Sequence, residues 1–432
     1  MDDPSRTRRK SEPPHLTKET VSGPTHHFSD SFEPQTPLGM QTPVRTGFPG
    51  EGRHQPSVSP GLRWAVEPVE ALPILVVPIV LSLCWELLVP HLAPLLGISG
   101  VPQENPFARF ILLSHRVPGP EPRYARGPGD VAFVAYYVVF FSLARQLITV
   151  ALGRRVGRFF GIVRTGKLER FGEQGYAFVY FLVFGAWGVH IMSELPTWWY
   201  RTKFFWIDYP HTAMIPSLKR YYLMQTAYWV QQFLVLVLGL EKPRKDYAEL
   251  VAHHVVTLWL VVFSYITNFT LIGSAVYTSM DIPDMLLALS KLLNYIQWNG
   301  TNNFVLAAFV VAWTYFRHYL NLAILWSVWF EVDAYLPANV VIPLYQRYTA
   351  FTALSLLQLL NLFWYYLIVR IAVRAMVTAK AEDVRSDDED EEGDGDGDDG
   401  GSKSVNAGHS YDGEGRNEGY YGRSEKSGMA GQ

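Results

Sequence analysis

Four titratable residues lie in apolar stretches of the sequence, where ionisable side chains are rare. His253 and His254 are adjacent in E-L-V-A-H-H-V-V-T-L-W-L, and Asp281 and Asp284 are one helical turn apart in M-D-I-P-D-M-L-L. A neutral histidine can take a proton from a reacting group, and a neighbouring carboxylate can fix the histidine tautomer and stabilise the imidazolium that forms. These residue types therefore predict general-base or nucleophilic catalysis within a membrane.

The two histidines are expected to differ in role, because neighbours on a helix are rotated by about 100° from each other. His253, Thr257, Ser264 and Asn268 follow steps of four, seven and four, which predicts one polar stripe along a helix. Such a stripe needs a partner inside the protein. The alternative is a structural histidine held by an interhelical hydrogen bond.

Lys291 follows the aspartates along the same predicted helix, and Pro283 lies between them, where it can kink the helix and free carbonyl groups to line a cavity. The alternative is that Lys291 only neutralises a carboxylate in a packed bundle. Arg317 and His318 form a second polar group, in which Arg317 is expected to pair with an aspartate or face an aqueous cavity.

Long apolar stretches must position these residues. Runs of roughly 20 apolar residues recur between about Ala71 and Val377, the length that crosses a bilayer as a helix. We expect an all-α integral membrane protein with about eight transmembrane helices. Their predicted centres are Ile79, Phe140, Phe184, Phe233, Leu260, Leu286, Arg317 and Phe363.

The chain divides by composition into five predicted parts: a disordered tail (1–68), a first transmembrane helix (69–98), a connecting loop (99–128), a catalytic membrane domain (129–380) and a disordered acidic tail (381–432). Basic residues follow the second, fourth and last predicted spans. They predict a cytosolic location for these segments and for both tails.

The tails carry two candidate phosphorylation sites. Ser11 follows R-T-R-R-K and Ser386 begins S-D-D-E-D-E-E, which are patterns for basophilic and acid-directed kinases. The single cysteine, Cys84, excludes an internal disulfide and a cysteine-based zinc site.

The segment from His253 to Tyr295 contains H-H, then S-Y, N, G, D-x-x-D, a lysine and N-Y in order. It resembles the Lag1p motif of the ceramide synthases (Lag1/Lac1 longevity-assurance type, TLC-domain family), and is most similar to the fungal members. About two-thirds of the chain shares this resemblance, including Trp187, Gly188 and His190, and Y-F-R-H-Y-L-N at Tyr315 to Asn321. The sequence departs from several animal members at Leu271 and in having D-I-P-D for D-x-S-D.

The resemblance implies a TLC-type helical bundle around an intramembrane active site in the endoplasmic reticulum membrane. It implies transfer of a fatty acyl group from acyl-CoA to the amine of a sphingoid base, without cofactor, metal or nucleic acid. It also implies an accessory small subunit of the Lip1 type and a homo- or heterodimer of synthase subunits. The expected catalytic residues are His253, His254, Asp281 and Asp284. The expected substrate-binding residues are Ser264, Tyr265, Asn268, Lys291, Arg317, His318, Trp187 and His190.

Other classes of membrane protein would require different sequence features. An iron-dependent lipid hydroxylase needs about eight histidines in repeated boxes. The apolar part of the chain has one H-H pair with scattered single histidines, which excludes this function. The sequence contains no inverted repeat of the kind found in transporters. A non-enzymatic TLC-type lipid-binding or translocon-associated protein remains the alternative.

Overall fold

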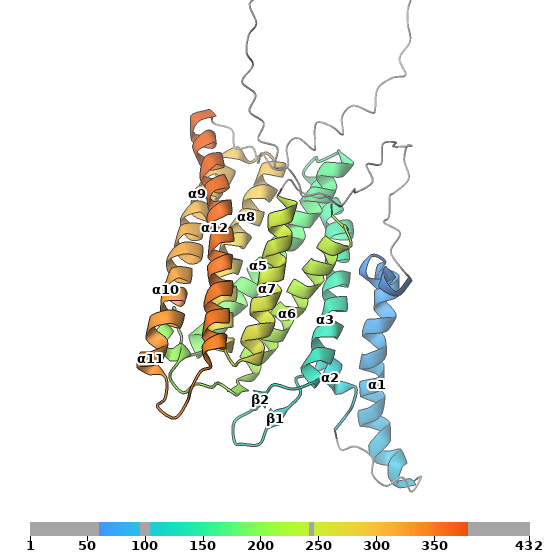
Figure 1. Ribbon diagram of the computed structural model, residues 1–432. Helices are drawn as coiled ribbons and strands as arrows, with labels where there is room; N and C mark the ends of the chain where they lie inside the picture. The colour runs from blue at the N-terminus through green and yellow to red at the C-terminus, as the bar shows by residue number, and fades with distance from the viewer. Residues whose placement is uncertain (1–59, 96–103, 242–245, 379–432) are drawn as a thin grey trace, which may run out of the picture. The chain divides into compact units, whose positions relative to one another are not determined.

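The computed structural model of the protein describes residues 60–95, 104–241 and 246–378, which are nearly all helical (Figure 1). The expected disorder of both tails, the candidate sites Ser11 and Ser386, and Lys242, Arg244 and Lys245 lie outside the described residues. Residues 60–65, which we expected to be disordered, form the short 3-10 helix η1 (Pro60–Ala65).

Five helices in the described part of the chain are long and apolar enough to cross a membrane. They are α1 (Pro68–Leu95), the continuous helix Gly129–Phe159, α5 (Thr165–Glu194), α7 (Tyr247–Ile266) and the Leu344–Arg370 part of α12 (Leu344–Thr378). Gly129–Phe159 comprises α3 (Gly129–Gln146), the π-helical segment η2 (Leu147–Gly153) and α4 (Arg154–Phe159). Many of their apolar side chains point outward, as in a protein that contacts lipid.

The other three predicted spans fall on helices that are more polar or interrupted. Two are α6 (Pro216–Val237) and α8 (Thr270–Tyr295). The third is α9 (Asn299–Trp313), continued by η4 (Thr314–Leu320), α10 (Asn321–Trp326), η5 (Ser327–Glu331) and α11 (Val332–Tyr335), of which η4 and η5 are π-helical. Buried polar residues such as Gln225 and Asp281 lower the hydropathy of these segments, so apolar length alone does not mark them as membrane spans.

A small sheet departs from the expected all-α fold and from the expected loop at 99–128. The segment contains α2 (Ala108–Ile111) and a hairpin of β1 (Arg116–Val117) and β2 (Arg123–Ala125), and β3 (Ala213–Met214) adds a third antiparallel strand. The remaining short element is η3 (Thr202–Phe205).

A buried ion pair fixes this sheet to the helices. Lys219 Nζ lies 2.7 Å from Asp130 Oδ1 and donates to the carbonyl oxygens of Ser114 and Ala125. Tyr265 at the end of α7 donates to the same carboxylate at 2.7 Å. The network therefore connects α3, α6 and α7 to the sheet at one end of the bundle.

Helices α5 and α8 pack closely in antiparallel orientation. Gly185 faces Asp281, and an added Cβ at Gly188 would lie 2.6 Å from Thr278 Oγ1 and from the Tyr221 hydroxyl oxygen. Small residues on α5 thus let α8 approach and place Asp281 in the interior, where it is fully buried.

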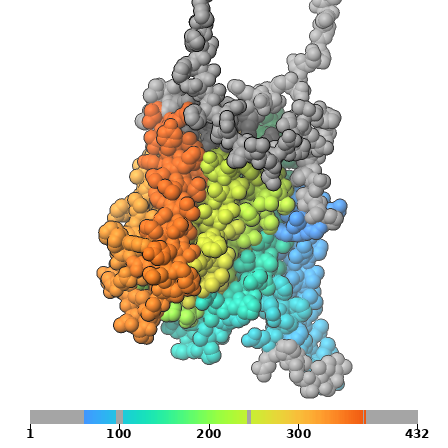
Figure 2. Space-filling model, viewed as in Figure 1, coloured from blue at the N-terminus to red at the C-terminus, as the bar shows by residue number. Residues whose placement is uncertain are grey.

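Helix α12 lies alongside α7 on the face shown in Figure 2. Together with α6, α8 and η4, these two helices surround the cavity described next.

Candidate active site

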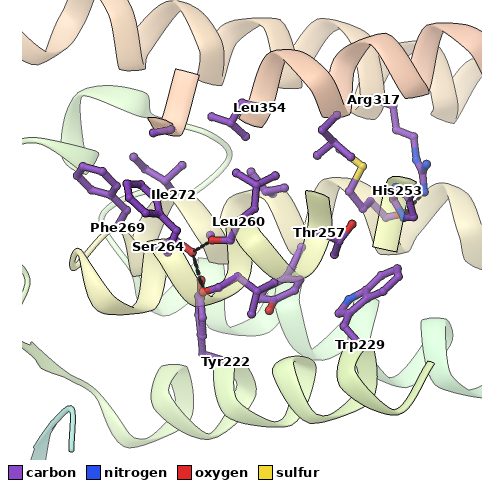
Figure 3. Close-up of a pocket in the computed structure, with 18 residues that line it drawn as sticks. Tyr222, Trp229, His253, Thr257, Leu260, Ser264, Phe269, Ile272, Arg317 and Leu354 are labelled. Carbon is purple, nitrogen blue, oxygen red and sulfur yellow. Dashed lines mark hydrogen bonds between the residues drawn. The ribbon is translucent and has the colours of Figure 1, made fainter. Parts of the chain in front are cut away.

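A mostly apolar cavity lies between α6, α7, α8, η4 and α12 (Figure 3). His253 and Arg317 lie together at one end, whereas Ser264 and Phe269 lie toward the other. The lining is formed by Tyr222, Trp229, His253, Thr257, Leu260, Val261, Phe263, Ser264, Phe269, Ile272, Gly273, Val276, Tyr277, Met280, Arg317, Ala350, Leu354 and Leu357.

His253 is held between two tryptophans. Its ring centroid is 5.7 Å from Trp229 and 5.3 Å from Trp364, and both contacts are edge-to-face. Within the described residues, His253 Nδ1 is buried without a hydrogen-bond partner. The aromatic packing therefore fixes the ring, while its nitrogen atoms remain available for chemistry.

The polar stripe predicted on α7 lies along the cavity. Thr257 and Ser264 line it together with His253, and Ser264 hydrogen-bonds to the Tyr222 hydroxyl and donates to the Leu260 carbonyl oxygen at 2.6 Å. Asn268 lies beyond the end of α7, in the turn before α8, with φ of 65°.

His254 points away from this lining. It is buried, its Nδ1 is 2.8 Å from the Leu250 carbonyl oxygen, and its ring lies 5.8 Å from Trp229. The hydrogen bond assigns the proton to Nδ1, and it satisfies the donor within α7.

Asp284 pairs with Arg317. Asp284 Oδ2 is 2.6 Å from Arg317 Nη2, and the arginine side chain is buried. This pair is one of the two arrangements expected for Arg317, and it neutralises a charge that is costly to bury.

Asp281 faces α5 and α6. Its Oδ2 accepts a hydrogen bond from Gln225 Nε2 at 2.5 Å, and Tyr180 donates to Gln225 Oε1 at 2.5 Å. Oδ1 of Asp281 is buried and has no hydrogen-bond partner in the described part of the chain. The structure thus places Gln225 beside Asp281 and Arg317 beside Asp284.

The remaining predicted residues lie around the cavity or away from it. Tyr265 belongs to the Lys219 network, and His318 Nδ1 accepts from Gln358 Nε2 at 2.8 Å. Trp187 packs against Tyr221, with centroids 5.5 Å apart. Lys291 is half-buried near the end of α8, and His190 is an exposed residue 3.6 Å from Glu194.

Four contacts of the site were missed from the sequence: the tryptophans 229 and 364 beside His253, Gln225 beside Asp281, and Asn361 beside Arg317. Gln225 and Asn361 are amides within apolar helices, and this was the signal that could have found them. Among the described residues, no group of three or more His, Cys, Asp or Glu side chains could hold a metal ion.

These features define a class: a multi-pass helical membrane protein with a titratable group at one end of an apolar cavity.

Residues 170–370 match the TLC domain family. The chain is 44% identical to sphingosine N-acyltransferase lac1 of Schizosaccharomyces pombe over 288 residues, which cover 65% of this chain and 74% of that protein. It is 39% identical to ceramide synthase LAG1 of Saccharomyces cerevisiae over 293 residues, covering 66% of this chain and 71% of that protein. Identity to ceramide synthase 4 of Bos taurus is 32% over 223 residues, covering 51% and 55%. The chain belongs to the TLC-domain ceramide synthase (sphingosine N-acyltransferase) family.

Proposed function

We propose that the protein is a ceramide synthase that transfers a fatty acyl group from acyl-CoA to the amine of a sphingoid base such as dihydrosphingosine or phytosphingosine. The observation that carries this function is the cavity, because it combines a long apolar lining with His253 and Arg317 at one end. The apolar lining matches the chemistry of an acyl chain, and in this proposal the reacting groups meet at the polar end.

The acyl chain lies along α7 in this proposal, with its thioester carbonyl beside His253. His253 is about 9 Å from the start of α7 at Tyr247, taking a rise of 1.5 Å per residue. The positive-inside rule assigns that end to the cytosol. The charged CoA headgroup can then stay in water while the thioester reaches the histidine.

His253 acts as the general base or as the nucleophile. In direct transfer it takes a proton from the bound amine, which then attacks the thioester. In the covalent route the imidazole attacks first, and the acyl-imidazole passes its acyl group to the amine. The buried Oδ1 of Asp281, which has no partner among the described residues, is proposed to bind the ammonium group of the sphingoid base.

The proposed membrane arrangement has eight spans: α6, α8 and the α9 to α11 segment in addition to the five apolar helices, with both tails cytosolic. The spans of the catalytic domain, residues 129–380, form a bundle around the cavity in the endoplasmic reticulum membrane. A Lip1-type small subunit and a dimer of synthase subunits are the proposed partners. No cofactor is needed, because acyl-CoA already carries an activated acyl group.

The function is tested by incubating the purified protein with palmitoyl-CoA and dihydrosphingosine and identifying the lipid product by mass spectrometry. N-palmitoyl dihydrosphingosine is the expected product. Binding of dihydrosphingosine without turnover would instead support the non-enzymatic lipid-binding alternative.

Trapping separates the two chemical routes. The protein is incubated with palmitoyl-CoA alone and its intact mass is measured. An added palmitoyl group that disappears when dihydrosphingosine is supplied supports the acyl-imidazole, whereas normal turnover without any adduct supports direct transfer.

A further inference from the structure

Arg317 occupies an unusual position in its helix. It lies in the π-helical segment η4, where the extra residue in the turn changes the direction of the side chains that follow α9. Such segments occur frequently at functional sites. The Arg317 side chain lines the cavity at the end that contains His253 (Figure 3).

Four contacts hold the guanidinium group. Its Nη2 is 2.6 Å from Asp284 Oδ2 and donates to the Met280 carbonyl oxygen at 3.1 Å, and its Nη1 donates to Asn361 Oδ1 at 3.2 Å. Its Cζ lies 4.1 Å from the centroid of the Trp313 ring. The group is therefore fixed before any ligand binds.

One nitrogen of this group makes no hydrogen bond within the described residues. Arg317 Nε is buried and has no hydrogen-bond partner in the described ranges. A buried donor without a partner is unfavourable unless a ligand satisfies it, so this N–H indicates an acceptor that arrives with the substrate.

The proposed reaction creates such an acceptor. When a nitrogen attacks the thioester carbon, a C–N bond forms and the electron pair of the C=O bond moves to oxygen. Collapse of this oxyanion breaks the C–S bond, and the thiolate leaves with CoA. In direct transfer, the proton that the amine loses passes to His253 and then to the thiolate or to solvent. In the covalent route, the amine adds to the acyl-imidazole, the second adduct collapses by breaking the C–N bond to His253, and the released imidazole takes the amine proton.

We infer that Arg317 is a catalytic residue whose Nε–H and positive charge stabilise this oxyanion, an inference that rests on the proposed function. Asp284 and Asn361 are positioning residues that fix the guanidinium group. Both chemical routes pass through a tetrahedral adduct of the same carbonyl, so the inference applies to either. Fixed donors of this kind stabilise a transition state without having to reorient.

Three other cavity donors lack hydrogen-bond partners among the described residues: the indole N–H of Trp229 and the hydroxyl groups of Thr257 and Tyr277. Only Arg317 carries a full positive charge, which favours it in an apolar surrounding where the oxyanion has no water to solvate it. Trp229→Phe removes the indole N–H, so this variant tests Trp229 as the alternative oxyanion donor.

The experiment compares Arg317→Gln and Arg317→Lys with wild type in two measurements: kcat for acyl transfer, and the Kd of a palmityl-CoA thioether, which lacks the carbonyl group. We expect kcat to fall by about 10²- to 10³-fold in both variants, as for loss of one oxyanion donor. The Kd of the thioether should stay within about twofold, because ground-state binding does not use the oxyanion.

Arg347→Gln is the matched control. Arg347 is also held by a carboxylate, with its Nη1 2.9 Å from Asp333 Oδ2, and lies over an aromatic ring, Trp329, but it is not part of the cavity lining in the described structure. We expect its kcat within about twofold of wild type. If the Arg317 variants do not fold, Asn361→Ala removes one contact and keeps the guanidinium group, and we expect about a 5- to 10-fold lower kcat with an unchanged thioether Kd.

Three outcomes overturn the inference. The first is a kcat for Arg317→Gln within about fivefold of wild type, and the second is a thioether Kd that rises as much as kcat falls. The third is a complete loss of acyl transfer in Trp229→Phe but not in the Arg317 variants. If Asn361→Ala is the variant measured, an unchanged kcat overturns it. Failure of the proposed function is distinct, because then the wild-type protein itself forms no ceramide.

Discussion

The rings of His253 and His254 lie 5.6 Å apart and are nearly perpendicular, and the two adjacent residues enter different surroundings. His253 lines the cavity, whereas the Nδ1 of His254 is paired with the Leu250 carbonyl oxygen. The geometry thus separates a histidine that lines the cavity from one whose hydrogen bond lies within α7.

This separation predicts that alanine variants of the two histidines differ in how much Tm and kcat they lose. His254→Ala should lower Tm more than His253→Ala, because it removes a buried ring and its hydrogen bond. His253→Ala should lower kcat by the larger factor, because it removes the group beside the thioester. Thermal unfolding in detergent and a steady-state assay measure both, and a larger Tm loss in His253→Ala would contradict the assignment.

Asp281→Asn tests the proposed ammonium site. The amide oxygen still accepts the hydrogen bond from Gln225, so the fold should be retained, but the negative charge for the amine is lost. We expect the KM for dihydrosphingosine to rise or kcat to fall by about 100-fold, with the thioether Kd unchanged. Wild-type kinetics for both substrates would remove Asp281 from the site.

The cavity predicts a change in acyl-chain selection. Leu354 lines it from α12, so Leu354→Trp should fill part of the apolar space and lower activity with long acyl-CoA more than with short acyl-CoA. The control is Leu359→Trp on the outer face of the same helix, where Leu359 is 62% exposed. Competition assays with mixed acyl-CoA lengths measure the ratio, and an equal shift in both variants would place the acyl chain elsewhere.

The Lys219–Asp130 pair predicts a stability effect. Lys219→Met leaves a buried carboxylate without its cation and should destabilise the protein by about 3–5 kcal/mol. Adding Asp130→Asn should recover part of the lost Tm, because it removes the unpaired charge. An unchanged Tm in the single variant would show that the pair does not stabilise this end of the bundle.

His211, in the connection between α5 and α6, predicts a pH dependence. Burial lowers the pKa of His211, although its contact with the Phe205 carbonyl oxygen opposes this. His211 therefore binds its proton at a higher pH in the unfolded chain than in the folded protein. The folded protein loses stability as the pH falls below about 6.5. Between pH 7.5 and pH 5.5, the Tm of His211→Asn should fall by less than the Tm of wild type. An equal fall in both proteins would show that His211 does not cause the pH dependence.

The sequence predicts the helical membrane fold and part of the site. Apolar length marks α1, α5, α7 and α12, and the spacing of His253, Thr257 and Ser264 predicts the face of α7 that lines the cavity. The short strands are missed, because two or three residues give no detectable alternation.

The partners of the two aspartates were beyond sequence reasoning. Asp281 contacts Gln225, which lies 56 residues before it in the sequence. Asp284 pairs with Arg317, which lies 33 residues after it. Which face of α8 meets which helix depends on the close packing against the glycines of α5, a relationship in three dimensions that spacing along one helix does not contain.

The most direct test of the account compares purified wild type with His253→Ala in an assay that counts CoA released and N-acyl dihydrosphingosine formed from the same reaction. Wild type should form one amide for each CoA released, and His253→Ala should form none above background while keeping its Tm and its thioether Kd. Wild-type rates of amide formation in folded His253→Ala would contradict the central claim that His253 performs the acyl transfer.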